Sequence, residues 1–384
     1  MRYIGVGLIL AFGSGSAAVA QAPERFSLAG EQVAIFNLAG EVRIERGTGS
    51  AVVVEVMRQG SDADRLTVRN SDVDGWRALF IQYPADRIVY PRMGRFSRTE
   101  FDVNADGTFG GRMLRARLTE DGFAVPSSIR LGSRDGRVRV SSTGSGLEAW
   151  ADLRVLVPEG RTVALHLGVG GINVANVDGH VRAEARSGSV DAHGVNGSLL
   201  ITTGSGGVSV AAVRGHVRID TGSGSVRADD VGNGTLFIDT GSGGVDATSL
   251  EVSALDIDTG SGSIRVEGAS APEMRLNTGS GGIRAHHVNT RDVELDTGSG
   301  SITLELLTDV RTARLDTGSG SVTVLLPSDL GADLTVDTGS GGINVSTPIQ
   351  LIQKRRYHLR GRLGDGQGMM TIDTGSGGVT LRPR

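Results

Sequence analysis

A single short motif, Thr-Gly-Ser-Gly, recurs through most of the chain and constrains its fold more than any other feature. Between residues 204 and 339 its first glycine returns after 18, 19, 19, 19, 19, 20 and 21 residues, and a last copy follows after 36. Two degenerate copies, at residues 167–171 and 185–189, extend the pattern toward the N-terminus. A period this short and regular is typical of a solenoid. The glycines expected at its corners are Gly222, Gly241, Gly260, Gly279, Gly298, Gly318, Gly339 and Gly375.

Each repeat carries the pattern of two half-buried β-strands joined by a glycine corner. Apolar and polar residues alternate on both sides of Gly-Ser-Gly, and a period of two indicates strands rather than helices. Around Gly260 we expect Leu255, Ile257, Ile264 and Val266 to point into the core. Their counterparts in two further repeats are Val217, Ile219, Val226 and Ala228, and Met274, Leu276, Ile283 and Ala285. The corner glycines are expected to supply the positive φ angles of a tight turn.

One repeat alone buries too little apolar surface to offset the entropy of ordering its residues. Stacked repeats solve this problem, because each backbone amide pairs with the rung above or below at a spacing of about 4.8 Å. The sequence therefore predicts an all-β fold, a β-solenoid or β-helix of about 19-residue rungs with Gly-Ser-Gly corners. A flat antiparallel sandwich of hairpins is the alternative, since it also needs frequent glycine-rich turns. The recurrence of one turn motif at one place in every repeat favours the solenoid.

Residues 1–20 have the three-part pattern of a secretory signal peptide. One positive charge at Arg2 precedes an apolar run over residues 4–12, and small residues follow up to Ala18-Val19-Ala20. No later run approaches the roughly 18 apolar residues of a membrane-spanning helix. We therefore expect an exported mature chain without a transmembrane segment, in the periplasm, on the cell surface or outside the cell. The absence of cysteine excludes disulfides, thiolate zinc sites and lipid-modified cysteines.

The regular repeats do not cover the whole chain. Ten of the fifteen aromatic residues of the chain lie between residues 23 and 149, Trp150 follows at the boundary, and region 23–150 shows irregular strand-like alternation. Because an unprotected solenoid end exposes strand edges and core, we expect this β region to cap the N-terminal end. Residues 151–347 are expected to form the solenoid repeats. Residues 348–384, where the period is broken, are expected to close the C-terminal end as a degenerate rung or hairpin.

The repeats also make the chain similar to a known family. The carrying features are Asp-Thr-Gly-Ser-Gly followed by alternating apolar residues, an entry segment over residues 157–171, and a closing segment over residues 361–377. They resemble a bacterial family of exported β-strand-repeat proteins of unknown function that are labelled adhesins. The likeness covers residues 150–384 well and residues 30–150 weakly. It implies a β-solenoid-like fold and export, and it brings no catalytic residues.

An aspartate precedes the threonine of the motif at Asp220, Asp239, Asp258, Asp296, Asp316, Asp337 and Asp373. Asp-Thr-Gly is also the active-site triplet of aspartic proteases, but those enzymes use one pair of carboxylates in a closed cleft, whereas a residue repeated at every corner is structural. In a solenoid these aspartates, with Asn277, form a column in which like charges repel. We expect Asx-turns, in which each carboxylate accepts from a backbone amide just ahead, to offset the repulsion. Divalent cations bridging neighbouring rungs are the alternative.

The sequence shows no catalytic constellation. Its seven histidines include no pair at i,i+4 spacing, and His286 and His287 are expected to point to opposite faces of a strand, which argues against joint metal binding. There is no nucleophile elbow and no phosphate loop. A net charge of −4 argues against a nucleic-acid partner. We therefore assign no catalytic residue, no cofactor and no metal.

A basic and aromatic stretch over residues 87–117 is the clearest candidate for binding a partner. Arginines interleaved with aromatic side chains suit anionic surfaces, although a solvated hairpin covering the cap explains them equally well. The candidate partner-binding residues are Arg92, Arg95, Arg98, Tyr90 and Phe96. The rod itself offers an outward row in which charges alternate in sign and are expected to form ion pairs across rungs. That row consists of Arg218, Phe237, Asp256, Arg275, Glu294 and Arg314.

These observations predict an exported, non-enzymatic, adhesin-like binding or structural module of the cell surface or envelope. Its expected partner is an anionic envelope polymer or a surface protein. The alternative function is that of a polysaccharide hydrolase or lyase on a β-helix scaffold. Such an enzyme needs two carboxylates about 5–10 Å apart, and we would expect exposed aromatics beside them.

Overall fold

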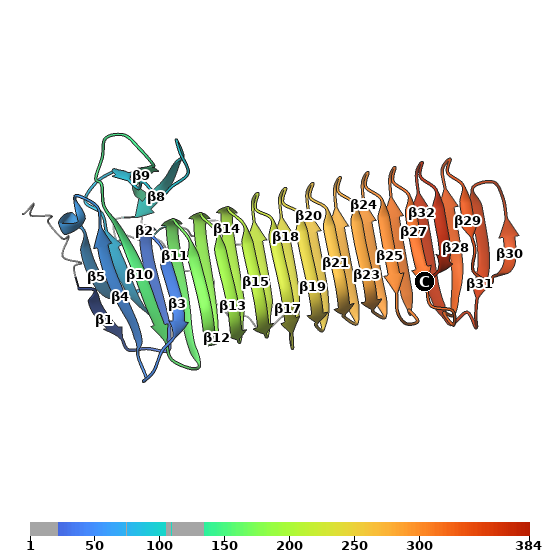
Figure 1. The fold of residues 1–384 in the computed structure, drawn as a ribbon, viewed down its shortest axis with the longest axis horizontal. Helices are drawn as coiled ribbons and strands as arrows, with labels where there is room; N and C mark the ends of the chain where they lie inside the picture. Colours follow the sequence, from blue (N-terminus) through green and yellow to red (C-terminus); the bar gives the residue numbers. More distant parts are fainter. Residues whose placement is uncertain (1–21, 74, 105–108, 110–133) are drawn as a thin grey trace, which may run out of the picture.

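The computed structural model describes residues 22–73, 75–104, 109 and 134–384, which form a long rod of stacked strands (Figure 1). The predicted signal peptide over residues 1–20 lies outside the described residues. Within the described ranges, no helix is long and apolar enough to cross a membrane.

Two sheets form the faces of the rod. In each repeat a strand of sheet B leads through the Gly-Ser-Gly corner into a strand of sheet A, and a second turn returns to sheet B. In spatial order, sheet B contains β5 (Thr67–Val73), β6 (Trp76–Gln82), β2 (Gln32–Ala39), β11 (Arg161–Val169), β12 (Ile172–Ser187), β14 (Leu199–Ser205), β16 (Val217–Thr221), β18 (Thr235–Thr240), β20 (Ala254–Thr259), β22 (Glu273–Thr278), β24 (Asp292–Thr297), β26 (Thr312–Thr317), β32 (Gly368–Thr374), β28 (Ala332–Thr338), β31 (His358–Leu363) and β30 (Gln350–Lys354).

Sheet A lies opposite and shares the long strand β12 with sheet B. In spatial order it contains β1 (Glu24–Leu28), β4 (Val52–Gln59), β10 (Trp150–Val157), β3 (Val42–Arg46), β12, β13 (Val190–Asn196), β15 (Val208–Arg214), β17 (Val226–Gly232), β19 (Val245–Glu251), β21 (Ile264–Ser270), β23 (Ile283–Asn289), β25 (Ile302–Leu306), β27 (Val322–Leu326), β33 (Val379–Pro383) and β29 (Ile343–Val345). A 3₁₀ turn, η1 (Ala63–Arg65), lies between β4 and β5.

The repeats stack in parallel and in register, which confirms the predicted β-solenoid. Each motif threonine pairs with the threonine of the next rung, from Thr221 to Thr240 to Thr259 and onward. The same parallel pairing holds for sheet A from β13 to β27. An antiparallel sandwich, the alternative, is therefore excluded for the repeats.

The core lies between the two sheets and contains the side chains that the alternation predicts. Leu255, Ile257, Ile264 and Val266 are all buried, and so are their counterparts in the two other repeats. The outward residues between them, such as Asp256, remain partly accessible. The period of two therefore gives the correct face for both strands of the rung.

A further inward column comes from an irregularity that the alternation does not reveal. Seven residues of sheet A have φ between 52° and 69°, one per rung: Asn176, Gly194, Ala212, Asp230, Ser249, Gly268 and His287. A left-handed residue breaks the alternation, so the next inward side chain after Val266 is that of Ala269. The column consists of Val177, Val195, Val213, Val231, Leu250, Ala269 and Val288, all buried.

Threonine, rather than aspartate, holds the corners together. The hydroxyl of Thr259 accepts a hydrogen bond from the amide of Gly262 (3.1 Å) and donates to the carbonyl of Gly243 in the preceding rung (2.9 Å). The same pair of bonds recurs at Thr240, Thr278, Thr297 and Thr317. Among the described residues no aspartate of the column accepts a corner amide, so the expectation of Asx-turns is wrong.

The corner glycines are needed for close packing, and the expectation of positive φ is wrong for them. None of the eight predicted corner glycines lies in the left-handed region. Instead, a Cβ on Gly260 would overlap the carbonyl oxygen of Gly241, and one on Gly262 would overlap that of Gly243. Successive rungs therefore approach so closely at the corner that only glycine fits.

At the N-terminal end the parallel stack begins earlier than residue 151. Strand β2 pairs in parallel with β11, and β3 pairs in parallel with β12 and β10. Antiparallel strands then cover the end, with β4 between β1 and β10 in sheet A and β5 beside β6 in sheet B. Region 23–150 thus contributes both the first parallel strands and the end cover.

A second core explains most of the N-terminal aromatics. It lies on the outer face of sheet B, where Phe36 of β2 stacks on Phe80 of β6 with ring centroids 4.9 Å apart. Strands β7 (Arg87–Val89), β9 (Arg134–Ser141) and β8 (Arg98–Asn104) form a small separate sheet that contributes Ile88, Phe101 and Val140 to this core. In Figure 1, β8 and β9 project from the side of the rod near β2.

At the C-terminal end the order of strands in space departs from their order in the chain. The last strands, β32 and β33, lie between β26–β27 on one side and β28–β29 on the other. Residues 350–363 form the hairpin β30–β31, which pairs antiparallel with β28 at the end of sheet B. The segment expected to close the solenoid therefore divides into an inserted rung and an end hairpin.

Candidate functional site

The loop between β7 and β8 and the first residue of β8 carry the five predicted partner-binding residues, and the structure separates them. Tyr90 is buried, with its hydroxyl 3.1 Å from Glu41 Oε1, and desolvation raises its pKa. Arg92 is tied to the body of the protein: its guanidinium lies 3.1 Å from Asp152 Oδ2 and over the ring of Trp150. These two side chains hold the loop in place rather than face a partner.

The remaining three residues form an exposed tip. Phe96 is 77% exposed, the highest value among the large hydrophobic side chains that the structure describes as exposed, and its φ of 62° lies in the left-handed region. The guanidinium of Arg95 lies 5.1 Å from the centroid of the Phe96 ring. Arg98, also exposed, begins β8 directly after the loop. We call Arg95, Phe96 and Arg98 the loop tip.

Two arginines of the small sheet, Arg137 and Arg139, are paired with acidic side chains. Glu100 on β8 accepts a hydrogen bond of 2.8 Å from Arg139 Nε on β9, and Arg137 lies 3.8 Å from Glu100 and Asp102. The hydrogen bond from Arg139 and the nearby guanidinium charges lower the pKa of Glu100. Arg95 and Arg98 form no ion pair within 4 Å among the described residues, so the loop tip presents two guanidinium charges.

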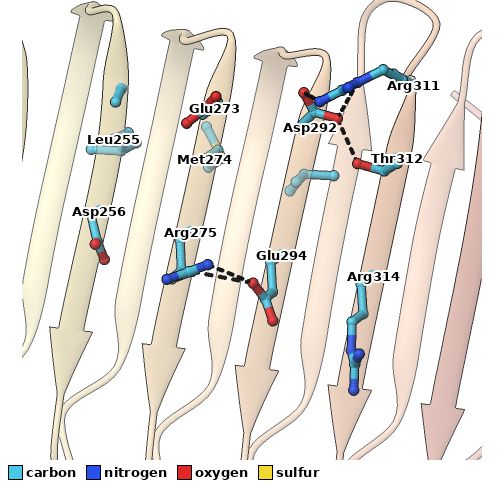
Figure 2. A pocket seen from close by; sticks show the side chains of 12 residues that line it. Leu255, Asp256, Glu273, Met274, Arg275, Asp292, Glu294, Arg311, Thr312 and Arg314 are labelled. Carbon is cyan, nitrogen blue, oxygen red and sulfur yellow. Dashed lines mark hydrogen bonds and ion pairs between the residues drawn. The ribbon is translucent and has the colours of Figure 1, made fainter.

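A shallow groove of about 590 Å³ crosses β20, β22, β24 and β26 on the outer face of sheet B (Figure 2). Asp256, Arg275, Glu294 and Arg314 of the predicted outward row line it. Arg275 and Glu294 form the expected ion pair across rungs at 3.1 Å. Nearer the N-terminus the row continues differently, because Arg218 lies 3.9 Å above the ring centroid of Phe237.

The other wall of the groove is also largely satisfied within the protein. Asp292 accepts hydrogen bonds from the Arg311 guanidinium at 2.6 and 2.9 Å and from the Thr312 hydroxyl at 2.6 Å (Figure 2). These bonds from Arg311 and Thr312 lower the pKa of Asp292. No aromatic side chain lines the groove, so it lacks the sugar-stacking surface expected of a polysaccharide enzyme.

The predicted aspartate column is present on the outer face of sheet B. Its members follow one another across the rungs as Asp220, Asp239, Asp258, Asn277, Asp296, Asp316, Asp373 and Asp337. Desolvation and the charge of the neighbouring Asp258 raise the pKa of Asp239. Asn277 interrupts the column and donates to Asp258 Oδ2 at 3.1 Å. In the parts of the chain that the structure describes, no group of three or more His, Cys, Asp or Glu side chains is arranged to hold a metal ion.

Replacing Asp239 by asparagine is expected to stabilise the rod at neutral pH, because it removes repulsion from the carboxylates on both sides. Two unit charges one strand spacing apart repel by about 0.8 kcal/mol in water, so we expect a gain of roughly 1 kcal/mol. The raised pKa means that the folded parent takes up a proton more readily than the unfolded chain. The gain should therefore be largest at pH 7 and disappear as the pH falls below about 4, the ordinary aspartate value. Urea unfolding at both pH values measures it, and a destabilised variant at pH 7 would contradict repulsion in the column.

The adjacent histidines His286 and His287 lie on the same face, so the expectation of opposite faces is wrong. The left-handed φ of His287 (53°) turns it outward beside His286. His286 Nδ1 lies 3.1 Å from Glu305, and His287 Nδ1 lies 2.7 Å from Glu267. The hydrogen bond to Glu267 and the charge of Glu305 raise the pKa of His287. The alternation rule fails at this left-handed position, and the sequence does not reveal the position because its residue type differs from rung to rung.

A buried polar group near the second core was not evident from the sequence. His166 stacks on Phe36, and its Nδ1 lies 2.9 Å from Glu184 Oε2. Burial raises the pKa of Glu184, but the hydrogen bond and charge of His166 together with the charge of Arg182 leave it below its ordinary value. Both side chains are at least nine-tenths buried, so they do not form part of the outer surface.

Comparisons with known proteins identify the repeat. Residues 214–382 match the model of the Toastrack DUF4097 family. The chain also pairs with the crystal structure of a putative cell adhesion protein from Clostridium sporogenes ATCC 15579, over 94% of this chain and 100% of that one. The identity is 10% and the TM-score 0.16, so this pairing carries no argument about fold or function. The curated proteins include no match. The glycine repeats and this match agree, and residues 214–382 of the chain are similar to the Toastrack DUF4097 family.

Proposed function

We propose that this protein is an exported, non-enzymatic β-solenoid binding module that engages an anionic polymer of the cell envelope through its loop tip. Export rests on the signal-peptide pattern of residues 1–20. The exposure of Phe96 beside Arg95 carries the proposal, because aromatic side chains and arginine are the residue types enriched at the buried centres of binding interfaces.

The chemistry of the loop tip favours an anionic partner. Among the described residues Arg95 and Arg98 form no ion pair within 4 Å, whereas Arg92, Arg137 and Arg139 do; the charge of Arg98 also acts on Glu100. An arginine beside an aromatic ring offers a charge and an apolar face together, which suits a sulfated, phosphorylated or carboxylated polymer. The long rod then acts as a spacer that carries this tip.

Replacing Arg95, Phe96 and Arg98 together by serine is expected to weaken binding to dextran sulfate at least about tenfold and to reduce its salt dependence. Arg92 stays unchanged, because its contacts with Asp152 and Trp150 hold the loop. Biolayer interferometry on the full chain, with uncharged dextran as the control polymer, measures the effect.

The matched control replaces Arg275 and Arg314, which lie in the groove on the rod, by serine. This variant removes two positive charges, as the loop-tip variant does, and is expected to bind like the parent. Loss of binding in the groove variant, with the loop-tip variant unaffected, would contradict the proposal.

A further inference from the structure

The C-terminal rung occupies a slot in the solenoid rather than its end. Strand β32 pairs in parallel with β26 on one side and β28 on the other, and β33 pairs in the same way with β27 and β29. Its inward side chains Met370, Ile372, Val379 and Leu381 are fully buried. From β13 to β27 each rung adds to the rung made just before it, whereas this one must enter between two rungs that precede it in the chain.

The slot is a site for a matching pair of strands. Without residues 368–384, β26 and β28 would present unpaired backbone edges on both walls and an apolar floor between them. The step from Gly318 to Gly339 is 21 residues instead of 19, and the extra length lets the chain pass over the slot. The slot therefore stays open until residues 368–384 arrive.

A short exposed hinge connects the inserted rung to the end hairpin. Residues 364–367 lie between β31 and β32, and Gly364 and Gly366 have φ angles of 49° and 74°. Gly364, Asp365 and Gln367 are exposed. Four residues span up to about 14 Å when extended, more than the roughly 10 Å of two strand spacings that separate β31 from β32. An extended hinge thus reaches beyond the chain's own slot.

We propose that the slot also accepts the same segment of a second copy, so that two chains exchange residues 368–384 through this hinge. The exchanged rung makes the same hydrogen bonds and buries the same side chains as in a single chain. Exchange of an identical element is a low-cost route to a dimer, and the balance then depends on the hinge and on the protein concentration.

Cysteine pairs test the exchange in the full chain, which has no cysteine of its own. Arg314 on β26 and Thr371 on β32 are register partners and are both exposed. Their Cα atoms are one strand spacing of about 4.8 Å apart, within disulfide range. In the variant R314C/T371C, a disulfide is intramolecular in a single closed chain and intermolecular in an exchanged pair.

The variant is refolded from urea at about 1 μM and at about 100 μM, oxidised, and separated on a non-reducing gel. We expect a covalent dimer that rises at least about fivefold with concentration. The control R275C/E294C joins β22 and β24, which are not exchanged, and is expected to give only covalent monomer at both concentrations. Complete disulfide formation in R314C/T371C with only monomer at 100 μM would overturn the proposal, and circular dichroism shows that both variants fold.

Discussion

Replacing Ile257 by aspartate is expected to cost more than about 4 kcal/mol and to unfold the rungs on both sides. Ile257 is fully buried and pairs with Ile238 and Leu276 of the neighbouring rungs. An unpaired carboxylate at this position would have no hydrogen-bond partner in the core. Because each rung is stabilised only by its neighbours, damage in the middle of the rod should spread. Urea unfolding followed by circular dichroism measures the shift in midpoint.

The matched control changes the next residue, which points outward. Asp256→Ala is expected to alter stability by less than about 1 kcal/mol, because its side chain lies in the groove on the outer face. Equal losses in the two variants would show that the inward and outward faces of β20 are assigned wrongly.

Replacing Gly262 by alanine is expected to cost about 3 kcal/mol, even though alanine is the smallest possible addition. A Cβ at this position would overlap the carbonyl carbon and oxygen of Gly243, and backbone atoms of the rung below cannot move without breaking its own pairing. The reason is close packing, since the φ of Gly262 does not lie in the left-handed region.

Gly244→Ser in the same corner is the control and is expected to be nearly neutral. The register places Gly244 between Ser225 and Ser263, so serine already occupies this slot in both neighbouring rungs. A Cβ there would be in ordinary contact with the Ser263 carbonyl, at 3.4 Å. If Gly262→Ala unfolded at the same temperature as the parent protein, the corner would have room for a Cβ, which would contradict the close packing of the rungs.

The solenoid was predictable because its information is local and repeated. The alternation of apolar and polar residues identifies Leu255 and Ile257 as inward. The regular spacing of the glycines gives the number of residues in each rung. The left-handed column was not predictable, since its position is held by asparagine, glycine, alanine, aspartate, serine and histidine in turn. Composition therefore gave no sign that Ala269 points inward or that His286 and His287 share a face.

The corners were also only partly predictable from the sequence. The residues of Asp-Thr-Gly-Ser-Gly are correctly placed at the turn, but local turn chemistry suggested aspartate as the capping residue. In the structure threonine makes those bonds, because its hydroxyl lies inside the corner and also reaches the carbonyl of the preceding rung. Contacts between neighbouring rungs decide which residue caps the corner, and the sequence of one repeat does not show these contacts.

The loop tip was only partly predictable for a related reason. A basic and aromatic stretch indicates a surface, but tertiary packing decides which aromatic is buried. Tyr90 and Phe96 are six residues apart, and one fills the second core while the other stands in solvent. The insertion of β32 and β33 between earlier strands was also not predictable, because similar repeats do not indicate the order in which the rungs stack.

Hydrogen–deuterium exchange of the full chain with dextran sulfate tests most directly whether the loop tip is the binding surface. Amides that a bound polymer covers exchange more slowly, so the method locates the contact without any substitution. We predict protection over residues 91–99, uncharged dextran giving none, and unchanged exchange over β20 to β26. Protection over β20 to β26 with residues 91–99 unchanged would place binding on the rod and contradict the proposed function.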